Sequence, residues 1–335
     1  MEPEERFFVY LAGDVPEAGA AELRSLLAGQ EGVEIKPLTD RLFLIKGALD
    51  IATLWHRMAL IKWAGRIHAE LPGLEPESLR QVAWERIVTS KEVLIALHGF
   101  QGQVKSPIEE LILSAIKERG NAALLRPSRA EQVIHLFRTP SSYYVGTSGR
   151  PPRRRWLDRR PRARPFFHPV ALHPRLARLM VNLAGPLGNA VLLDPFCGTG
   201  SILIEAAILG LRALGSDLSL RMCKGALLNA RHAGLTDIDI IQADARNMPL
   251  REVGAIVTDL PYGRASSLHH IKAEELIGAF LTEAGRLLVG GSSMVLLYSH
   301  DLERYVRSGE FLRVQRFRIP VHRRLTRILA VLKKS

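Results

Sequence analysis

Four aspartates in the C-terminal half of the chain each stand at, or just after, the end of a short apolar segment. They are Asp194, Asp217, Asp244 and Asp259. If the segments are strands of one parallel sheet, their carboxyl ends share the edge where such sheets bind ligands. Carboxylates there accept hydrogen bonds from hydroxyl and amino groups and attract a cation. One aspartate alone is more simply a helix cap or turn residue, but four in this pattern predict a binding site.

A glycine-containing loop, Pro195–Gly200, follows the first of these aspartates. Its glycines let the backbone approach a ligand, and Asp217 stands where a ribose-binding acid follows such a loop. Leu203 replaces the third glycine of a nicotinamide-dinucleotide motif, and no Gly-Lys pair of a P-loop follows. We therefore expect a nucleoside cofactor without a pyrophosphate. S-adenosylmethionine fits, because its sulfonium and amino groups are cationic.

The chain from residue 166 onward alternates predicted strands and helices. The predicted strands are Ala190–Asp194, Ala213–Asp217, Ile238–Gln242, Ala255–Asp259 and Met294–Ser299, followed by Phe311–Ile319 and Thr326–Leu332. The predicted helices cover residues 173–184, 200–210, 219–233, 271–288 and 301–307. Nearly all-apolar strands that alternate with helices are typical of a parallel sheet covered on both faces. We predict an α/β, doubly wound, Rossmann-like sheet here.

The first half of the chain predicts two α+β units. The first has strands at Arg6–Leu11, Val33–Lys36, Leu42–Lys46 and Leu60–Glu70, with helices at Glu17–Leu27 and Ile51–Met58. This βαββαβ order is that of a ferredoxin-like unit. The second has helices at Glu77–Ile87 and Ile108–Arg119 and strands at Glu92–His98, Gln132–Arg138 and Ser142–Gly146.

Positive charge is concentrated in two segments. The chain has a net charge of +12, and 36 of its 46 basic residues are arginine. Residues 150–165 hold eight arginines, four prolines and one tryptophan, and residues 311–335 hold eight basic residues and no acidic one. We interpret residues 150–165 as a linker or exposed arm rather than core. The two segments favour a nucleic-acid partner, although a solvated linker and a basic tail would have the same composition.

Composition excludes several other classes. Apolar residues form 47% of the 335 residues and charged residues 24%, as in a soluble protein with a core. No apolar run is long enough for a membrane helix, and the acidic N-terminus is unlike a secretory signal. Cys197 and Cys223 are too few for a disulfide framework or a zinc site. We expect a cytoplasmic protein with no bound metal.

The chain resembles the archaeal-type tRNA guanine-10 N2-methyltransferases, and residues 164–265 resemble the Rossmann-fold amino-methyltransferase domain. The resemblance rests on Arg164–Pro169, His173–Arg178, Met180–Leu183, Asp194–Gly200, Asp217 and Asp259–Arg264. It implies a ferredoxin-like domain over residues 1–74, a THUMP RNA-binding domain over 75–149, a basic Arg/Pro linker over 150–165 and a methyltransferase domain over 166–335. The family usually has Asp-Pro-Pro-Tyr where this chain has Leu260 after Asp259. Leucine keeps the backbone carbonyl, so we expect activity to be retained.

The resemblance also implies roles for individual residues. The expected catalytic residues are Asp259, Leu260, Pro261 and Tyr262. Asp259 and a carbonyl of Leu260 or Pro261 would accept the two N–H bonds of a guanine amine, and Tyr262 would stack on the extruded base. The expected cofactor-binding residues are His168, Pro169, Asp194, Phe196, Cys197, Gly198, Thr199, Gly200, Asp217, Leu218, Asp244, Ala245 and Asp259. The expected RNA contacts are Arg153, Arg154, Arg155, Arg159, Arg160 and Arg264.

Within that set the resemblance places His168 and Pro169 against the cofactor. It gives Asp217 the ribose hydroxyls and Asp244 the adenine amino group.

The leading hypothesis is a methyltransferase that forms N2-methylguanosine, or the dimethyl form, in tRNA. One alternative is another tRNA or ribosomal RNA guanine, or the N6-amine of adenine in DNA, although we expect no DNA partner. The other is a non-catalytic RNA-binding scaffold with a relic cofactor pocket. We expect a monomer and leave a small activator subunit open.

Overall fold

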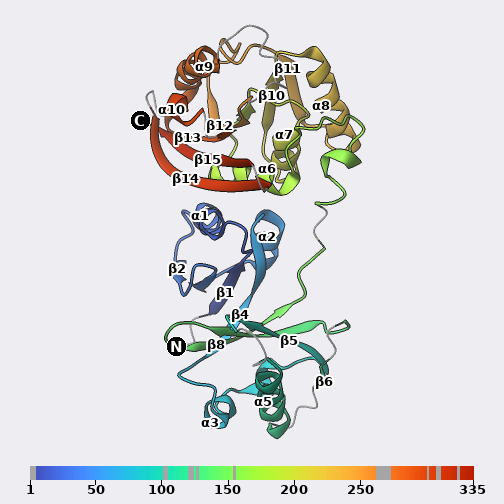
Figure 1. The fold of residues 1–335 in the computed structure, drawn as a ribbon, viewed down its shortest axis with the longest axis vertical. Helices are drawn as coiled ribbons and strands as arrows, with labels where there is room; N and C mark the ends of the chain where they lie inside the picture. The colour runs from blue at the N-terminus through green and yellow to red at the C-terminus, as the bar shows by residue number, and fades with distance from the viewer. Residues whose placement is uncertain are drawn as a thin grey trace. The chain divides into compact units, whose positions relative to one another are not determined.

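The computed structural model describes residues 5–100, 105–119, 124–125, 128–153, 156–261, 273–299, 302–306, 311–322 and 325–335. The chain divides into two compact units, each with its own sheet (Figure 1). The first comprises Met1–Pro16, Gly29–His56 and Ile61–Arg153. The second comprises Glu17–Ala28, Arg57–Leu60 and Arg154–Ser335. Helix α1 (Pro16–Leu27) thus clusters with the C-terminal unit, although it precedes most of the first unit in sequence.

The first unit is built on an eight-stranded sheet in the order β2-β3-β1-β4-β8-β7-β5-β6. Its strands are β1 (Arg6–Leu11), β2 (Glu34–Pro37), β3 (Leu42–Lys46), β4 (Ile61–Leu71), β5 (Glu92–His98), β6 (Leu124–Leu125), β7 (Gln132–Arg138) and β8 (Tyr143–Gly149). Its helices are α2 (Ile51–Arg57), α3 (Pro76–Arg80), α4 (Trp84–Ile87) and α5 (Lys105–Glu118). Strand β1 pairs antiparallel with both β3 and β4, as a ferredoxin-like unit requires. Because β4 also pairs with β8, one sheet crosses the predicted boundary at residues 74 and 75, and that boundary stays a prediction.

The single helix predicted over Glu77–Ile87 is wrong, because α3 and α4 are separate short helices. The chain turns between them, and this turn brings Trp84 into the core. The Trp84 side chain is fully buried, and its indole N–H donates to the carbonyl oxygen of Leu79 over 2.8 Å. Burial of a large aromatic side chain with a satisfied N–H outweighs continuation of the helix.

The second unit is an α/β, doubly wound domain, as predicted. Its strands are β9 (Leu192–Asp194), β10 (Ala213–Asp217), β11 (Ile238–Gln242), β12 (Val253–Asp259), β13 (Leu288–Ser299), β14 (Phe311–His322) and β15 (Leu325–Lys334). The sheet order is β11-β10-β9-β12-β13-β15-β14. Strands β9 to β13 are parallel, and the C-terminal hairpin of β14 and β15 adds two antiparallel strands at one edge.

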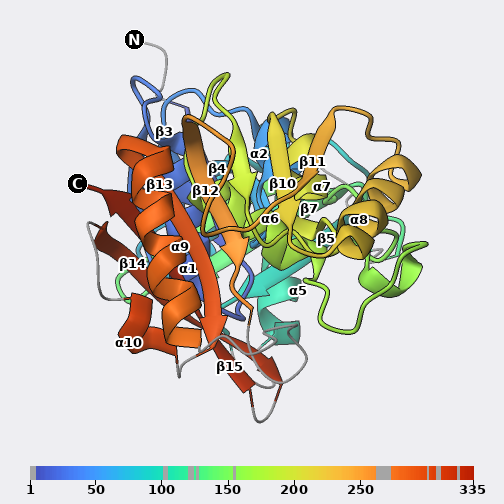
Figure 2. The same ribbon diagram turned by 90° about the horizontal axis from the view of Figure 1, so that it is seen from above.

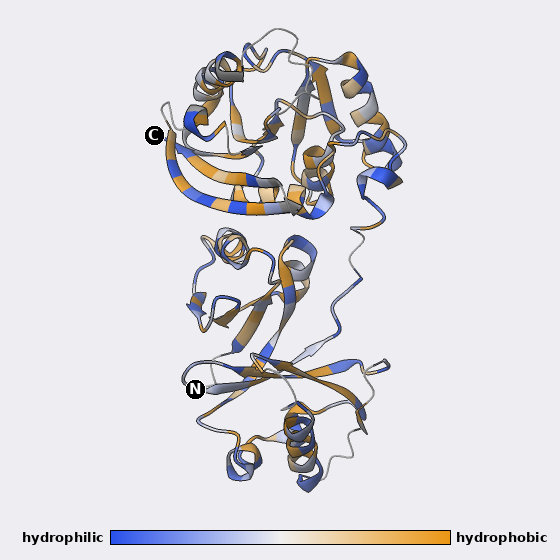
Figure 3. Ribbon diagram, in the orientation of Figure 1, coloured by the Kyte–Doolittle hydropathy of each residue, from blue (hydrophilic) through white to orange (hydrophobic). Residues whose placement is uncertain are grey.

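Helices cover both faces of this second sheet. They are α6 (Pro174–Leu183), α7 (Ser201–Ile208), α8 (Leu220–His232), α9 (Ala273–Leu287) and α10 (Glu303–Val306). Figures 1 and 2 show α9 on one side of the strands and α7 and α8 on the other. The core between α9 and the sheet contains buried side chains of β12, β13 and β15. In Figure 3 the inner strands are mostly hydrophobic, whereas the edge strand β14 alternates between hydrophilic and hydrophobic residues.

Among the residues that the structure describes, no helix is long and apolar enough to cross a membrane.

Candidate active site

The site forms where the strand order of the second sheet reverses. From β9 the chain continues to β10 and β11 on one side, and then returns to place β12 on the other side of β9. Ligands bind at such a switch point, beyond the carboxyl ends of the strands. Asp194 ends β9, Asp217 ends β10 and Asp259 ends β12, and Asp244 follows β11 by two residues. The fold therefore brings the four predicted aspartates to one edge.

A single cavity contains most of the predicted cofactor and catalytic residues. The predicted residues that line it are His168, Asp194, Phe196, Cys197, Gly198, Thr199, Asp217, Leu218, Asp244, Ala245, Asp259, Leu260 and Pro261. Pro169 and Gly200 are not among its lining residues. Sequence reasoning missed several apolar and polar lining residues, which are Val170, Ala171, Leu172, Pro195, Ser201, Ile202, Met222, Arg246 and Leu276. The predicted residues Tyr262, Arg264, Arg154 and Arg155 lie outside the described residues.

The loop between β9 and α7 depends on two glycines with left-handed backbone angles. Gly198 has φ of 49° and Gly200 has φ of 80°, which side chains rarely tolerate. Asp217 holds this loop from the neighbouring strand. Its carboxylate accepts hydrogen bonds from the backbone amides of Gly198 over 3.1 Å and Ser219 over 2.8 Å. Burial raises the pKa of Asp217 above its ordinary value, against the effect of these two hydrogen bonds.

Asp194 is the most deeply buried of the four aspartates, with 2% of its surface exposed. Its carboxylate accepts hydrogen bonds from the Thr258 hydroxyl over 2.6 Å and from the Phe196 amide over 3.3 Å. Desolvation by burial raises the pKa of Asp194 to about 7. Asp194 thus links the ends of β9 and β12 at the switch point. When it is ionised, it also adds negative potential to the cavity wall.

Asp244 lies at the more exposed end of the cavity and forms an ion pair with Arg246. The closest oxygen–nitrogen distance is 2.6 Å, and both side chains are 32% exposed. Hydrogen bonding from Arg246 lowers the pKa of Asp244, so this carboxylate is ionised at neutral pH. A nucleobase amino group at Asp244 would share the carboxylate with Arg246.

The carboxylate of Asp259, the predicted catalytic residue, has a partner that the sequence did not indicate. Arg327 on β15 donates from Nη1 to Asp259 Oδ2 over 2.9 Å, and its Nη2 contacts the other carboxylate oxygen. Arg327 is 3% exposed, whereas Asp259 keeps 19% of its side-chain surface exposed. Burial raises the pKa of Asp259 and Arg327 opposes that rise. The only sequence signal was a single arginine next to the apolar run Ile328–Leu332.

The backbone after Asp259 is fixed by pairing with β13. The Leu260 amide donates to the carbonyl oxygen of Leu297 over 2.9 Å, and the Leu260 side chain is fully buried. Proline at position 260 could not make this hydrogen bond, because it has no N–H. Leu260 therefore extends the strand pairing by one residue, while its own carbonyl remains part of the loop that is predicted to be catalytic.

The chemistry of the cavity suits a cationic nucleoside. Four aspartates line it, and Arg246 is the only basic lining side chain that the described residues provide apart from the histidine. Arg246 is already neutralised by Asp244. A pyrophosphate would be repelled by this wall, whereas a sulfonium and an amino group would be attracted. The residues present therefore fit S-adenosylmethionine.

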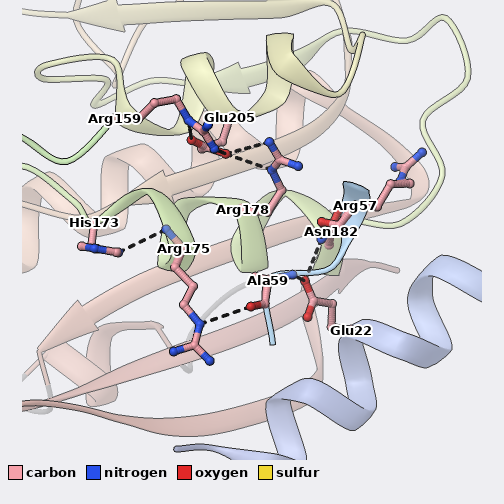
Figure 4. Close-up of polar contacts among 9 residues, drawn as sticks. All are labelled: Glu22, Arg57, Ala59, Arg159, His173, Arg175, Arg178, Asn182 and Glu205. Atoms are coloured by element: carbon pink, nitrogen blue, oxygen red, sulfur yellow. Dashed lines mark hydrogen bonds and ion pairs between the residues drawn. The ribbon is translucent and has the colours of Figure 1, made fainter. Parts of the chain in front are cut away.

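Part of the arginine-rich segment is anchored to the second unit rather than exposed. Arg159 donates to Glu205 of α7 over 2.8 Å, and Arg178 of α6 contacts the other Glu205 oxygen over 2.7 Å (Figure 4). Glu205 is fully buried. The Trp156 ring lies beside both guanidinium groups, at 5.1 Å and 5.7 Å.

Further along the same segment, Arg164 is 8% exposed and donates to the Ser201 hydroxyl over 2.7 Å. The prediction of an exposed arm is wrong for Arg159 and Arg164, because this buried glutamate and hydroxyl offer partners that composition does not reveal. Among the expected RNA contacts, Arg159 is engaged with Glu205, whereas Arg153 and Arg160 are exposed.

A second polar network in this unit joins α6 to α1 and to the segment Arg57–Leu60 (Figure 4). Glu22 of α1 is fully buried and accepts hydrogen bonds from the amides of Ala59 and Leu60 over 2.7 and 2.9 Å. Asn182 of α6 donates to the same carboxylate over 2.7 Å. Arg175 donates to the Ala59 carbonyl over 3.2 Å. These bonds satisfy a buried charge that would otherwise be costly.

Comparison with known proteins gives a family for the chain. Residues 161–326 match the model of the RMKL-like, methyltransferase domain family. A probable tRNA (guanine(10)-N2)-dimethyltransferase from Methanothermococcus thermolithotrophicus is 34% identical over 173 residues, which are 48% of this chain and 99% of that protein.

Two further relatives are named tRNA (guanine(10)-N2)-dimethyltransferase. The protein from Methanothermobacter thermautotrophicus is 43% identical over 178 residues, or 52% of this chain and 53% of that protein, so the match spans about half of its length. The protein from Pyrococcus abyssi is 28% identical over 340 residues, or 98% of this chain and 99% of that protein.

The solved structure of TrmN from Thermus thermophilus shares the fold. Its TM-score is 0.62 at 21% identity, over 98% of this chain and 100% of that chain.

Proposed function

Because the chain belongs to the tRNA (guanine(10)-N2)-dimethyltransferase family, we propose that it methylates the exocyclic N2 amine of a guanine in tRNA. The proposed target is position 10, and the product is N2-methylguanosine or, after a second transfer, N2,N2-dimethylguanosine. The observation that carries the proposal is the position of Asp259. It ends the strand beside the switch point, it faces the cavity, and it starts the catalytic loop.

When bound, S-adenosylmethionine supplies a methyl group on a sulfonium and leaves as the neutral thioether. The chain's own residues would bind and orient the two reactants. Asp217 and the Gly198 loop would hold the ribose, and the ionised Asp244 would accept from the adenine amino group. Asp194, Asp217 and Asp244 make the cavity favourable for a cation.

Asp259 would accept one N–H bond of the guanine amine, and the carbonyl of Leu260 or Pro261 would accept the other. The amine is a poor nucleophile, because its lone pair is delocalised into the ring. Two fixed acceptors orient that lone pair, and the carboxylate stabilises the positive charge that develops on nitrogen. The nitrogen gains the methyl group and releases one proton to solvent.

Nucleoside mass spectrometry on unmodified tRNA, incubated with the chain alone and S-adenosylmethionine, tests this function. We expect methylated guanosine with the native chain and none with Asp259→Ala. Asp239→Ala, which removes an exposed aspartate on β11, is the matched control and should retain activity. Cofactor-induced thermal stabilisation should persist in Asp259→Ala. Methyladenosine would contradict the guanine assignment, and tRNA with adenine at position 10 should remain unmethylated.

RNA binding is proposed to involve the exposed arginines Arg153 and Arg160. Each phosphate that a protein neutralises releases counterions, so affinity should fall steeply as salt rises. Replacing both arginines by glutamine should weaken tRNA binding and flatten its salt dependence. Equal salt slopes for the variant and the native chain would contradict this role. A tRNA substrate would place the protein in the cytoplasm, and activity of the chain alone would show that no activator subunit is required.

A further inference from the structure

We propose that Arg327 is a positioning residue for the methyl transfer, which fixes the orientation of the Asp259 carboxylate and keeps it an anion. This inference rests on the proposed function, because it gives Arg327 a task in that reaction. Arg327 lies 68 residues from Asp259 in sequence and two strands away in the sheet. Its role therefore follows from the fold and not from a motif.

The pairing of β12, β13 and β15 brings the guanidinium of Arg327 to the carboxylate of Asp259. Asp259 is opposite Leu297 in the β12–β13 pairing, and Leu297 is opposite Leu329 in the β13–β15 pairing. Arg327 stands two residues from Leu329 and reaches back across β13, where its Nη2 also lies 3.5 Å from the Leu297 carbonyl. Two parallel N–H bonds to the two oxygens of one carboxylate fix both its position and its plane.

This pairing leaves acceptor capacity for a substrate. A carboxylate has about four lone-pair positions, and the guanidinium uses two of them. Asp259 lines the cavity and is partly exposed there, whereas Arg327 is nearly fully buried and is not among the lining residues. The remaining lone pairs of Asp259 are therefore available to amine N–H donors in the cavity, while Arg327 acts from behind.

The surroundings explain why the carboxylate needs a cation. From β9, Asp194 presents a second carboxylate, and the negative charge of Asp259 disfavours ionisation of Asp194. On β12 and β13, the neighbouring groups are the Thr258 hydroxyl and the Leu297 carbonyl, which carry no charge. Burial further raises the pKa of Asp259, and within the described residues Arg327 is the charged group that lowers it. Without Arg327 the carboxyl would take up a proton and lose the charge that stabilises the reacting amine.

Single-turnover methylation of tRNA, measured from mildly acidic to mildly alkaline pH, tests the proposal. For Arg327→Met we expect a rate about 100-fold lower at neutral pH, in line with loss of one electrostatic contact in a transition state. The acid limb of its profile should move to higher pH, so that part of the activity returns in alkali. The rate and the pH profile of Arg327→Lys should lie between those of the native chain and those of Arg327→Met. Arg231→Met, at an exposed position in the last turn of α8, is the control and should match the native chain.

Two further measurements separate positioning from folding and from the proposed function itself. In an Asp259→Asn background, Arg327→Met should cause little additional loss, because its effect passes through Asp259. Carboxyl NMR titration, with Asp259→Asn used to assign the signal, should show a higher pKa for Asp259 in Arg327→Met. This titration needs no substrate, so it tests Arg327 even if the native chain methylates no guanine.

The proposal is overturned if Arg327→Met is folded and keeps both the native pH profile and the native Asp259 titration. A native chain that is inactive on tRNA, with the expected titration shift, would instead reject the proposed function alone.

Discussion

The Thr258 hydroxyl donates a hydrogen bond of 2.6 Å to the Asp194 carboxylate, which ties the ends of β12 and β9 together. Thr258 immediately precedes Asp259, the proposed catalytic residue, and Asp194 precedes the loop Pro195–Gly200, which is proposed to hold the cofactor. Both side chains are buried. This one bond therefore connects the strand that carries the proposed acceptor for the substrate amine with the strand that leads into the proposed cofactor loop.

Asp194→Asn should change the pH dependence of stability. The pKa of Asp194 is about 7 in the folded chain and near 3.8 in the unfolded chain. The folded state thus binds the proton more tightly, and stability is lost as pH rises through this interval, by up to roughly 4 kcal/mol. Asparagine keeps the acceptor for Thr258 and removes this loss. Urea unfolding at about pH 5 and about pH 8 measures it. If the free energy of unfolding differed between the two pH values by the same amount in Asp194→Asn as in the native chain, the assignment would be contradicted. Stabilisation by the cofactor should be weaker in the variant.

Glu205→Gln should destabilise the second unit by about 3 kcal/mol, because it removes the negative charge that the buried Arg178 and the partly buried Arg159 share. Thermal unfolding checks the effect. Glu252→Gln, an exposed acidic residue, should leave the transition unchanged. If Glu205→Gln unfolded at the same temperature as the native chain, the ion network would have no net role in stability.

Gly225→Ala should be destabilising, although alanine is the better helix former. A Cβ atom at Gly225 of α8 would lie 2.0 Å from the Phe166 ring, so the aromatic side chain would have to move. We expect a loss of about 1–3 kcal/mol from this overpacking. Gly278→Ala on α9 is the matched control, because nothing lies within 4 Å of its added Cβ. The stability of that variant should rise by about 0.5–1 kcal/mol. A rise in stability at both positions would show that the Phe166 ring moves aside at little cost.

Leu260→Pro would introduce the residue that the family usually has after the aspartate that corresponds to Asp259. It should lower stability by about 1–3 kcal/mol, because the Leu297 carbonyl loses the hydrogen bond from the Leu260 amide and a buried side chain shrinks. Methylation measured at a temperature where both chains are folded should remain within a few-fold, since the carbonyl at position 260 is retained. A complete loss of activity in a folded variant would indicate that the leucine side chain shapes the site.

Local patterns predicted the strands well where turn residues bounded a short apolar run. Arg6–Leu11, Leu42–Lys46 and Ala213–Asp217 have the predicted limits. The same patterns placed the aspartates at strand ends, because one carboxyl edge follows from a parallel sheet.

Partners that are distant in sequence could not be predicted. Arg327 contributed only to a basic tail, and its contact with Asp259 depends on the antiparallel return of β15 across β13. Arg159 contributed only to a basic segment, and its buried partner Glu205 lies 46 residues later. In both cases composition gave the charge, and only tertiary packing decided whether that charge faces solvent.

The pairing of β4 with β8 has a consequence for synthesis of the chain. Strand β4 ends at Leu71 and its neighbour β8 begins at Tyr143, so about 70 residues must emerge from the ribosome before this edge is covered. Until then β4 presents unpaired backbone groups, which is how strands recruit other chains and aggregate. A truncated form that stops near residue 74 would keep that edge permanently. The first half of the chain is therefore expected to become stable in one late, cooperative step.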